Sequence, residues 1–225
     1  MASAIGGALP LAVGVALSPI PIIAVALMLT THRARVNGPL FIAGWLAGLA
    51  VVGAIVLSVA GPAGASSSGT PATWVGWMKL ALGLLLLVVA ARQFRGRPRA
   101  GAQASLPKWM AKLDDIRPLA ACGLAALLAG ANPKNLLLAV GAATSIAQTG
   151  VSGAGQAVAY LVFALVGTLG VGILVGMYFV LGPRADKRLG GLKDWMGAHN
   201  AVIMSVLCLV IGAKLIGDAI SGLTG

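Results

Sequence analysis

A lysine and two asparagines flank a proline in the tetrapeptide Asn132-Pro133-Lys134-Asn135, inside an apolar run that extends from Leu119 to Thr149. A proline within a helix removes a backbone donor and clashes with the preceding turn, so the helix must kink or break. The amides of Asn132 and Asn135 can satisfy the freed backbone groups. A lysine within a membrane span is costly unless it is paired or hydrated, which makes Lys134 a candidate electrostatic contact for an anionic group. Its structural alternative is a lysine that snorkels or donates to carbonyls of the broken helix.

A second interruption, Ser18-Pro19-Ile20-Pro21, lies at a comparable depth in the first apolar run. Two broken helices at matching positions in two halves of a chain indicate the binding site of a transporter. The simpler interpretation is kink chemistry alone, since proline is tolerated in membrane helices. We predict a substrate-binding cavity lined by Ser18, Pro19, Pro21, Asn132, Pro133, Lys134 and Asn135.

A second polar group lies in the last apolar run, where Lys214 and Asp218 are four residues apart and share one helix face. We predict a structural ion pair near the outer surface, with a proton-relay role for Asp218 as the weaker alternative. Lys79, in the third apolar run near the same surface, could join the pair or snorkel outward.

Conventional catalysis is not indicated by this sequence. Cys122 and Cys208 lie in apolar segments without metal-type spacing. We find no metal-ligand cluster, phosphate loop or plausible Ser/His/Asp set. The sequence therefore predicts no enzyme, no metal and no cofactor.

Composition identifies an all-α integral membrane protein. The chain has 225 residues, of which 59% are hydrophobic and only 9% charged, with a mean hydropathy of +0.97. Soluble domains keep about a quarter of their residues charged. Because a span needs about 20 apolar residues, this length allows six transmembrane helices with short connections.

The net charge of +11 is distributed as expected for a membrane protein rather than for a nucleic-acid-binding one. The expected spans cover residues 4–30, 39–60, 74–91, 119–148, 155–181 and 199–220. The basic residues fall in the connections 31–37, 92–117 and 184–194, whereas 61–73 and 149–153 carry no charge. The positive-inside rule then predicts cytoplasmic basic loops and both termini outside. Within the longest loop, residues 106–113 could form an amphipathic helix on the membrane surface.

The two halves of the chain show signs of an internal repeat. Aligning Pro19 with Pro133 also aligns Ser18 with Asn132. Each half has three spans, so the second is inverted relative to the first, and the equivalent breaks should meet near the membrane midplane. The expected parts are a first three-helix repeat (1–92), a basic linker (93–117) and a second, inverted three-helix repeat (118–225).

The glycines of the second and fifth spans are expected to allow close helix packing. They include Gly44 and Gly48 in the second span and Gly167, Gly170, Gly172 and Gly176 in the fifth.

The motifs Ser18-Pro19-Ile20-Pro21-Ile22 and Asn132-Pro133-Lys134-Asn135-Leu136-Leu137 resemble those of the lysine-exporter superfamily. The chain is most similar to its actinobacterial branch, the glycopeptidolipid- and sulfolipid-addressing proteins, and the likeness extends over nearly the whole length. The resemblance implies a bacterial inner-membrane transporter that helps to move envelope lipids or glycolipids outward.

The residues and the resemblance together predict export or flipping of an anionic lipid or glycolipid. A central lysine suits a phosphate, sulfate or carboxylate head group, whereas a cation exporter should keep a carboxylate near the midplane. One alternative is nevertheless a small-solute exporter for amino acids or cations. The other is a non-transporting scaffold for a larger lipid-export machine. Expected partners are membrane lipids and the anionic substrate, with a homodimer or a larger transporter as possible protein partners.

Overall fold

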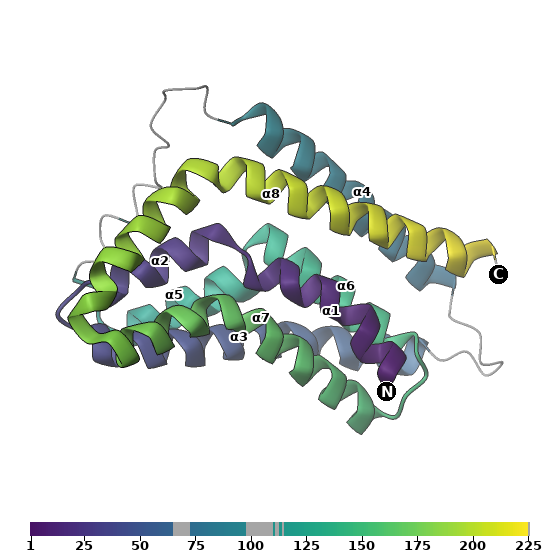
Figure 1. Ribbon diagram of the computed structural model, residues 1–225. Helices are drawn as coiled ribbons and strands as arrows, with labels where there is room; N and C mark the ends of the chain where they lie inside the picture. The colour runs from purple at the N-terminus through teal and green to yellow at the C-terminus, as the bar shows by residue number, and fades with distance from the viewer. Residues whose placement is uncertain (65–72, 98–109, 111–112, 114, 225) are drawn as a thin grey trace.

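The computed structural model describes residues 1–64, 73–97, 110, 113 and 115–224, and within these residues the chain is helical and contains no strand. Figure 1 shows the elements as a bundle of roughly aligned helices. Their bounds are α1 Ala2–Ala16, α2 Pro19–Leu29, α3 Ala34–Gly64, α4 Thr73–Arg95, α5 Pro118–Gly130, α6 Pro133–Ala147, α7 Gly153–Leu181, the 3-10 turn η2 Gly182–Arg184 and α8 Ala185–Thr224.

Four of these helices, α3, α4, α7 and α8, are long and apolar enough to cross a membrane. The remaining ones form two bent pairs, α1 with α2 at 51° and α5 with α6 at 62°. Each pair is either one broken span or a re-entrant loop, so the structure holds four to six candidate spans. The predicted all-helical membrane protein with breaks at the two proline motifs is confirmed. The count of six spans, the inverted repeat and the division into three parts stay predictions.

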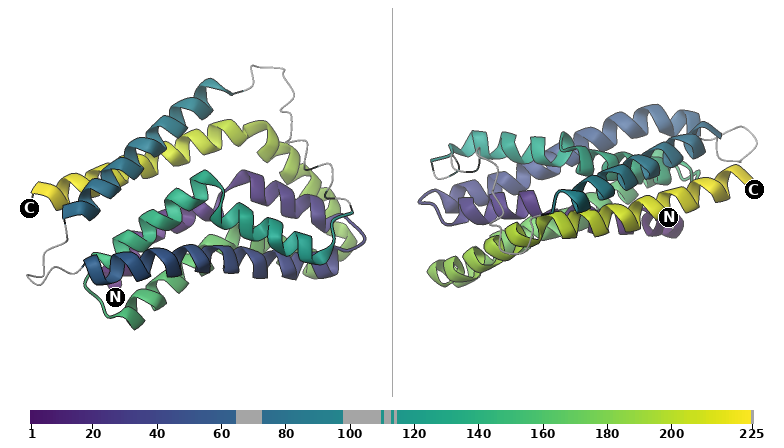
Figure 2. Two further views of the ribbon diagram at one scale, coloured as in Figure 1. Left: turned by 180° about the vertical axis from the view of Figure 1, so that it is seen from behind. Right: turned by 90° about the horizontal axis from the view of Figure 1, so that it is seen from above.

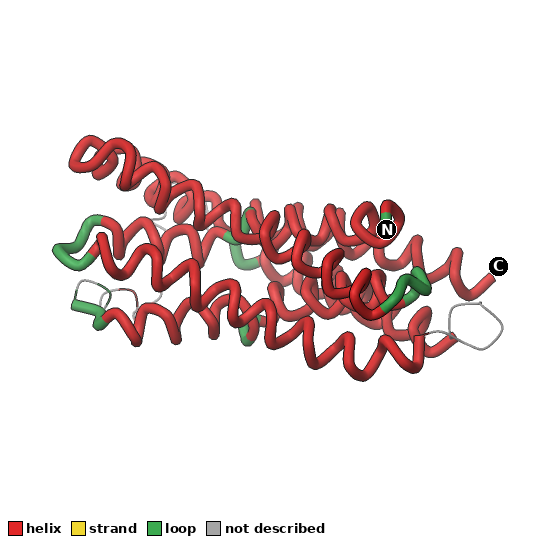
Figure 3. Tube along the Cα trace, turned by 90° about the horizontal axis from the view of Figure 1, so that it is seen from below, coloured by secondary structure: helices red, strands yellow, loops and turns green. Residues whose placement is uncertain are grey.

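Both helix breaks follow from proline chemistry. Pro19 and Pro133 are the first residues of α2 and α6, a position where the missing N–H costs nothing and the fixed φ favours helix. The residues before them, Ser18 and Asn132, adopt extended backbone with ψ of 111° and 122°, as a following proline requires. In Figure 3 the two breaks are the short loop segments midway along the bundle.

In two pairs of helices, glycine allows the backbones to come into direct contact. A Cβ added at Gly44 of α3 would collide with the carbonyl of Cys122 in α5, and one at Gly170 of α7 with the carbonyl of Ala16 in α1. Gly48 and Gly167 also face neighbouring helices closely. The packing prediction is confirmed for these four glycines. It is wrong for Gly172 and Gly176, where an added Cβ would meet open space.

Helices α4 and α8 run side by side along one edge of the bundle (Figures 1 and 2). They approach closely where Gly83 of α4 faces Gly212 of α8, with each glycine's added Cβ 2.9 Å from the other's carbonyl oxygen. The chain's two ends lie at the same end of the bundle, together with the connection between α6 and α7 (Figure 1). The turn between α2 and α3 and the start of α8 lie at the opposite end.

Several expected loops are shorter in the structure, because α3 continues to Gly64 and α4 to Arg95. The basic segment 184–194, predicted as a loop, is helical from Ala185 onward, because its Ala, Lys, Arg and Leu residues favour helix whatever their hydropathy. Residues 34–37 likewise belong to α3 rather than to the preceding loop. The expected amphipathic helix at 106–113 lies outside the described residues except for Met110 and Leu113, which are buried.

Candidate functional site

The side chain of Lys134 spans the space between the two helix breaks. It starts from the first turn of α6, and its Nζ donates to the backbone oxygen of Gly14 at 2.7 Å and to Oγ of Ser18 at 2.8 Å. Lys134 is only 3% exposed. The lysine that the sequence places beside one break is therefore bound to the other break.

Ser18 and Asn135 complete the connection. The Ser18 hydroxyl donates to Oδ1 of Asn135 at 2.6 Å, while Nδ2 of Asn135 donates to the backbone oxygen of Leu128 at 3.0 Å. Both side chains are buried. We call these five residues (Gly14, Ser18, Leu128, Lys134 and Asn135) the helix-break network.

The two carbonyl acceptors of this network are made available by the breaks themselves. In a continuous helix the oxygen of Gly14 would accept from the Ser18 amide, and the oxygen of Leu128 from the Asn132 amide. Instead, the Ser18 amide donates to Val15 at 3.1 Å and the Asn132 amide to Leu127 at 3.1 Å. Each freed carbonyl takes a side-chain donor, since a buried backbone oxygen without a partner is costly.

The other predicted site residues lie around the network rather than in it. The Asn132 side chain accepts from the backbone amide of Lys134 at 3.2 Å and so caps α6. Pro19 and Pro21 are buried, whereas Asn132 is half-buried and Pro133 is exposed. The structure thus brings Ser18, Lys134 and Asn135 together, and the other four residues shape the two breaks.

Helix α8 contributes part of the surroundings of Lys134. Cys208 lies within electrostatic range of the ammonium, and Ile211 packs at Gly14. Both of these α8 side chains are buried. The described ion pairs are Lys193–Asp194 and Lys214–Asp218, so within the described residues no carboxylate neutralises Lys134.

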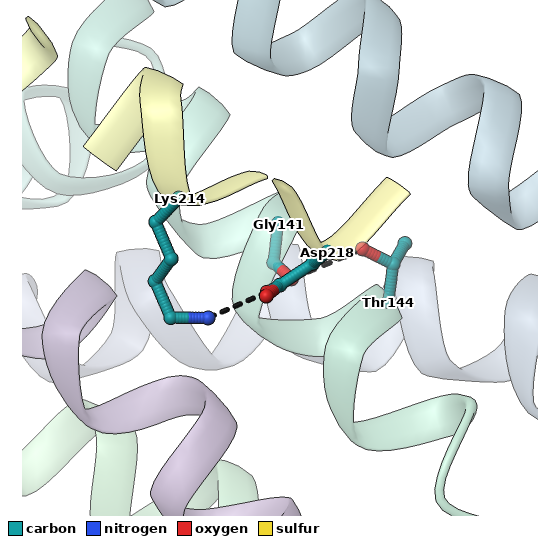
Figure 4. A network of polar contacts seen from close by, with 4 residues as sticks. All are labelled: Gly141, Thr144, Lys214 and Asp218. Carbon is teal, nitrogen blue, oxygen red and sulfur yellow. Dashed lines mark hydrogen bonds and ion pairs between the residues drawn. The ribbon is translucent and has the colours of Figure 1, made fainter. Parts of the chain in front are cut away.

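Lys214 and Asp218 form the predicted ion pair on α8, with Nζ and Oδ2 2.5 Å apart and both side chains about one-third exposed. Figure 4 shows this pair beside α6, where the Thr144 hydroxyl donates to the backbone oxygen of Gly141 at 3.0 Å. Lys79 of α4 is buried and within electrostatic range of both charges. This group belongs to the α4–α8 edge and is separate from the helix-break network.

Sequence reasoning missed the backbone acceptors of the network and the contribution of Cys208. A signal for the acceptors exists, because Gly14 and Leu128 each precede the proline of their break by five residues. The proximity of Cys208 to Lys134 cannot be read from the neighbouring sequence, because it depends on how α8 packs across the two breaks.

The central feature is thus a buried ammonium held by neutral partners where two broken helices meet. Helix N-termini carry partial positive charge, and those of α2 and α6 both lie at this point. The arrangement can attract an anionic group.

The chain matches a known protein family. No curated protein and no solved structure matches the chain. The family model described as "Sap, sulfolipid-1-addressing protein" matches residues 8–221, which is nearly the whole chain. This protein therefore belongs to the SfLAP family of sulfolipid-1-addressing proteins.

Proposed function

We propose that this protein exports or flips an anionic cell-envelope lipid or glycolipid across the bacterial inner membrane, through a site between its two helix breaks. The observation that carries the proposal is the Lys134 ammonium, buried between the breaks without a neutralising carboxylate among the described residues. Membership of a family concerned with sulfolipid addressing agrees with an anionic lipid as substrate.

The donors of the site suit a phosphate, sulfate or carboxylate head group. An ammonium has three N–H donors, and the structure uses two of them, toward Gly14 and Ser18. The third donor is then available to an anion, and the partial positive charge at the N-termini of α2 and α6 adds to the attraction. An anion that replaces the Gly14 carbonyl as partner would exchange a neutral acceptor for a charged one, which is the stronger interaction.

The described arrangement is closed, since Lys134 is 3% exposed. Substrate binding in this proposal separates the two breaks, so that the head group enters the helix-break network while the acyl chains stay in the lipid. A homodimer or a larger transport partner would enlarge the space around this route.

The test is lipid movement in proteoliposomes that contain the purified protein and a fluorescent anionic lipid. We expect wild type to move the lipid between leaflets, and Lys134→Ala and Lys134→Gln to lose this activity. Lys193→Gln is the matched control, because it removes a half-buried lysine of α8 that is paired with the exposed carboxylate of Asp194 and lies outside the helix-break network. Loss of movement in the control as well as in the Lys134 variants would contradict the proposal.

The second candidate is a non-transporting scaffold that recruits a larger lipid-export machine. It is favoured by one observation, that the partners of Lys134 are protein groups, as in a purely structural tie between helices. Folded wild-type protein that moves no lipid, with cellular lipid export that survives Lys134→Ala but not neutralisation of Arg92 and Arg95, would establish the scaffold.

A further inference from the structure

A groove lies between α4 and α8, the two helices that form one edge of the bundle. It is near the C-terminal end of α4, away from the end of the helix pair that holds Lys79 and Asp218. Its volume is about 420 Å³, and its lining includes Leu87, Ala91 and Phe94 of α4 and Val206 and Leu209 of α8. Ser205, the polar residue in the lining, donates its hydroxyl to the backbone oxygen of Val202. The groove therefore presents apolar surface to whatever fills it.

Arginines gather where this groove reaches the end of α4. Arg92 and Arg95 occupy the last turn of the helix and are exposed. The Arg97 guanidinium lies 3.7 Å from the ring centroid of Phe94 and donates to the Phe94 backbone oxygen at 3.1 Å. A ligand in the groove would thus have apolar contacts along its length and three cationic groups at one end.

We propose that the groove binds one anionic phospholipid of the bilayer, with an acyl chain between α4 and α8 and the phosphate beside Arg92, Arg95 and Arg97. Basic pockets between membrane helices bind anionic head groups, and basic residues next to a span attract anionic lipid. The groove is distinct from the helix-break network, since none of the five network residues lines it.

Charge argues for a lipid rather than a second copy of this chain in the groove. Two copies related by a two-fold axis along the membrane normal would bring their α4 ends, with the same arginines, to the same depth. Like charges placed opposite each other oppose association. An anionic lipid instead neutralises the arginines and fills the apolar space.

The proposal is tested by electron paramagnetic resonance on vesicles of reconstituted full-length protein. The probes are phosphatidylglycerol and phosphatidylcholine, each with a nitroxide near the end of one acyl chain, and the readout is the motionally restricted fraction. An arginine near the membrane surface contributes about fivefold to association with anionic lipid. We expect wild type to prefer phosphatidylglycerol by at least about fivefold, and Arg92→Gln/Arg95→Gln to remove most of that preference.

The groove itself is tested with a filling variant and a matched control. Ala91→Trp places a large ring in the groove and should abolish the preference, whereas Val88→Trp, at an exposed α4 position outside the lining, should retain it. Equal restriction of the two probes by wild type, or an unchanged preference in Ala91→Trp, would overturn the proposal.

Two further variants distinguish the lipid groove from the helix-break network and from a dimer interface. Lys134→Ala should keep the phosphatidylglycerol preference, so that failure of the transport proposal and failure of the lipid groove are distinguishable. Loss of the preference in Lys134→Ala would overturn the proposal that the groove binds lipid independently of the helix-break network.

In a Cys122→Ser background, Ala91→Cys should give no dimer with a short bifunctional thiol reagent. A cross-linked dimer would show that a second copy occupies the groove and would also overturn the proposal.

Discussion

The Ser18 hydroxyl holds a central position because it acts in both directions. It accepts from the Lys134 ammonium and donates to the Asn135 amide oxygen, so it connects the break after α1 with the break after α5. A hydroxyl has one donor and two acceptor lone pairs, and this geometry satisfies the donor and one of the lone pairs. Removing that oxygen leaves a buried ammonium and a buried amide oxygen each with one partner fewer.

Ser18→Ala should lower the free energy of unfolding by about 1–2 kcal/mol, the cost of leaving buried polar groups partly unsatisfied in a membrane protein. Thermal unfolding of the detergent-solubilised protein measures the change. Ser58→Ala is the control, since Ser58 is exposed and donates only to Ile55 in its own helix. Equal unfolding temperatures for Ser18→Ala and wild type would show that the network adds no stability.

The sequence was sufficient to select Ser18, Lys134 and Asn135, because their polar groups stand out within apolar runs beside prolines. It was insufficient to identify their partners. Gly14 and Leu128 take part through their backbone oxygens, which every residue possesses. Their residue types therefore do not indicate that they belong to the network. The exposed position of Pro133 depends on the direction in which α6 leaves the break, which composition does not specify.

Helix pairs on both sides of the network depend on glycine at their closest approach. The α3–α5 contact at Gly44 places the α3 backbone against the carbonyl of Cys122. Small residues allow such approaches in membranes, where dispersion replaces the hydrophobic effect as the main attraction between helices. The α5 half of the second broken pair is therefore positioned by α3.

Gly44→Ala should destabilise the protein by about 1–3 kcal/mol, because the added methyl group overlaps backbone atoms that cannot move independently. Gly172→Ala, at a position of α7 with open space, should change stability by less than about 0.5 kcal/mol. Thermal unfolding of the two variants side by side gives the comparison. A tolerated alanine at Gly44 would mean that α3 and α5 can separate at little cost.

The boundaries of helices could be predicted from the sequence where a proline interrupts the helix. They could not be predicted where only the charge of a segment suggested a loop. The breaks at Pro19 and Pro133 lie where the sequence places them. The segment 184–194 was expected to be a loop because it is polar, but hydropathy reports burial in lipid, not helix formation. The turn before α8 is made by Gly182, whose φ of 52° ends α7.

The two ends of the whole molecule differ in charge. The chain termini and the α6–α7 connection lie at one end, and the α2–α3 turn with Arg33 and the start of α8 with Lys187 and Arg188 lie at the other (Figure 1). An excess of Lys and Arg marks the cytoplasmic side. This arrangement supports, as a proposal, a topology with both termini outside.

A membrane-impermeant thiol reagent should label Ser152→Cys, in the α6–α7 connection, on intact cells. It should label His32→Cys, in the α2–α3 turn, only after the membrane is opened, because this turn lies at the basic end. Cys122→Ser serves as the background, and the buried Cys208 is retained. Labelling of position 32 on intact cells would show that the orientation is the opposite of the proposed one, with the α2–α3 turn outside.

The helix-break network also has an electrical aspect. Its ammonium is held by the neutral oxygens of Gly14 and Ser18, so the charge of Lys134 is uncompensated by these partners. An elementary charge that moves through the full membrane potential changes energy by about 2.3 kcal/mol per 100 mV. If Lys134 moves along the bilayer normal when the breaks separate, the membrane potential therefore contributes to the free energy of that movement. A bound anion would neutralise the charge of Lys134 and so remove this contribution.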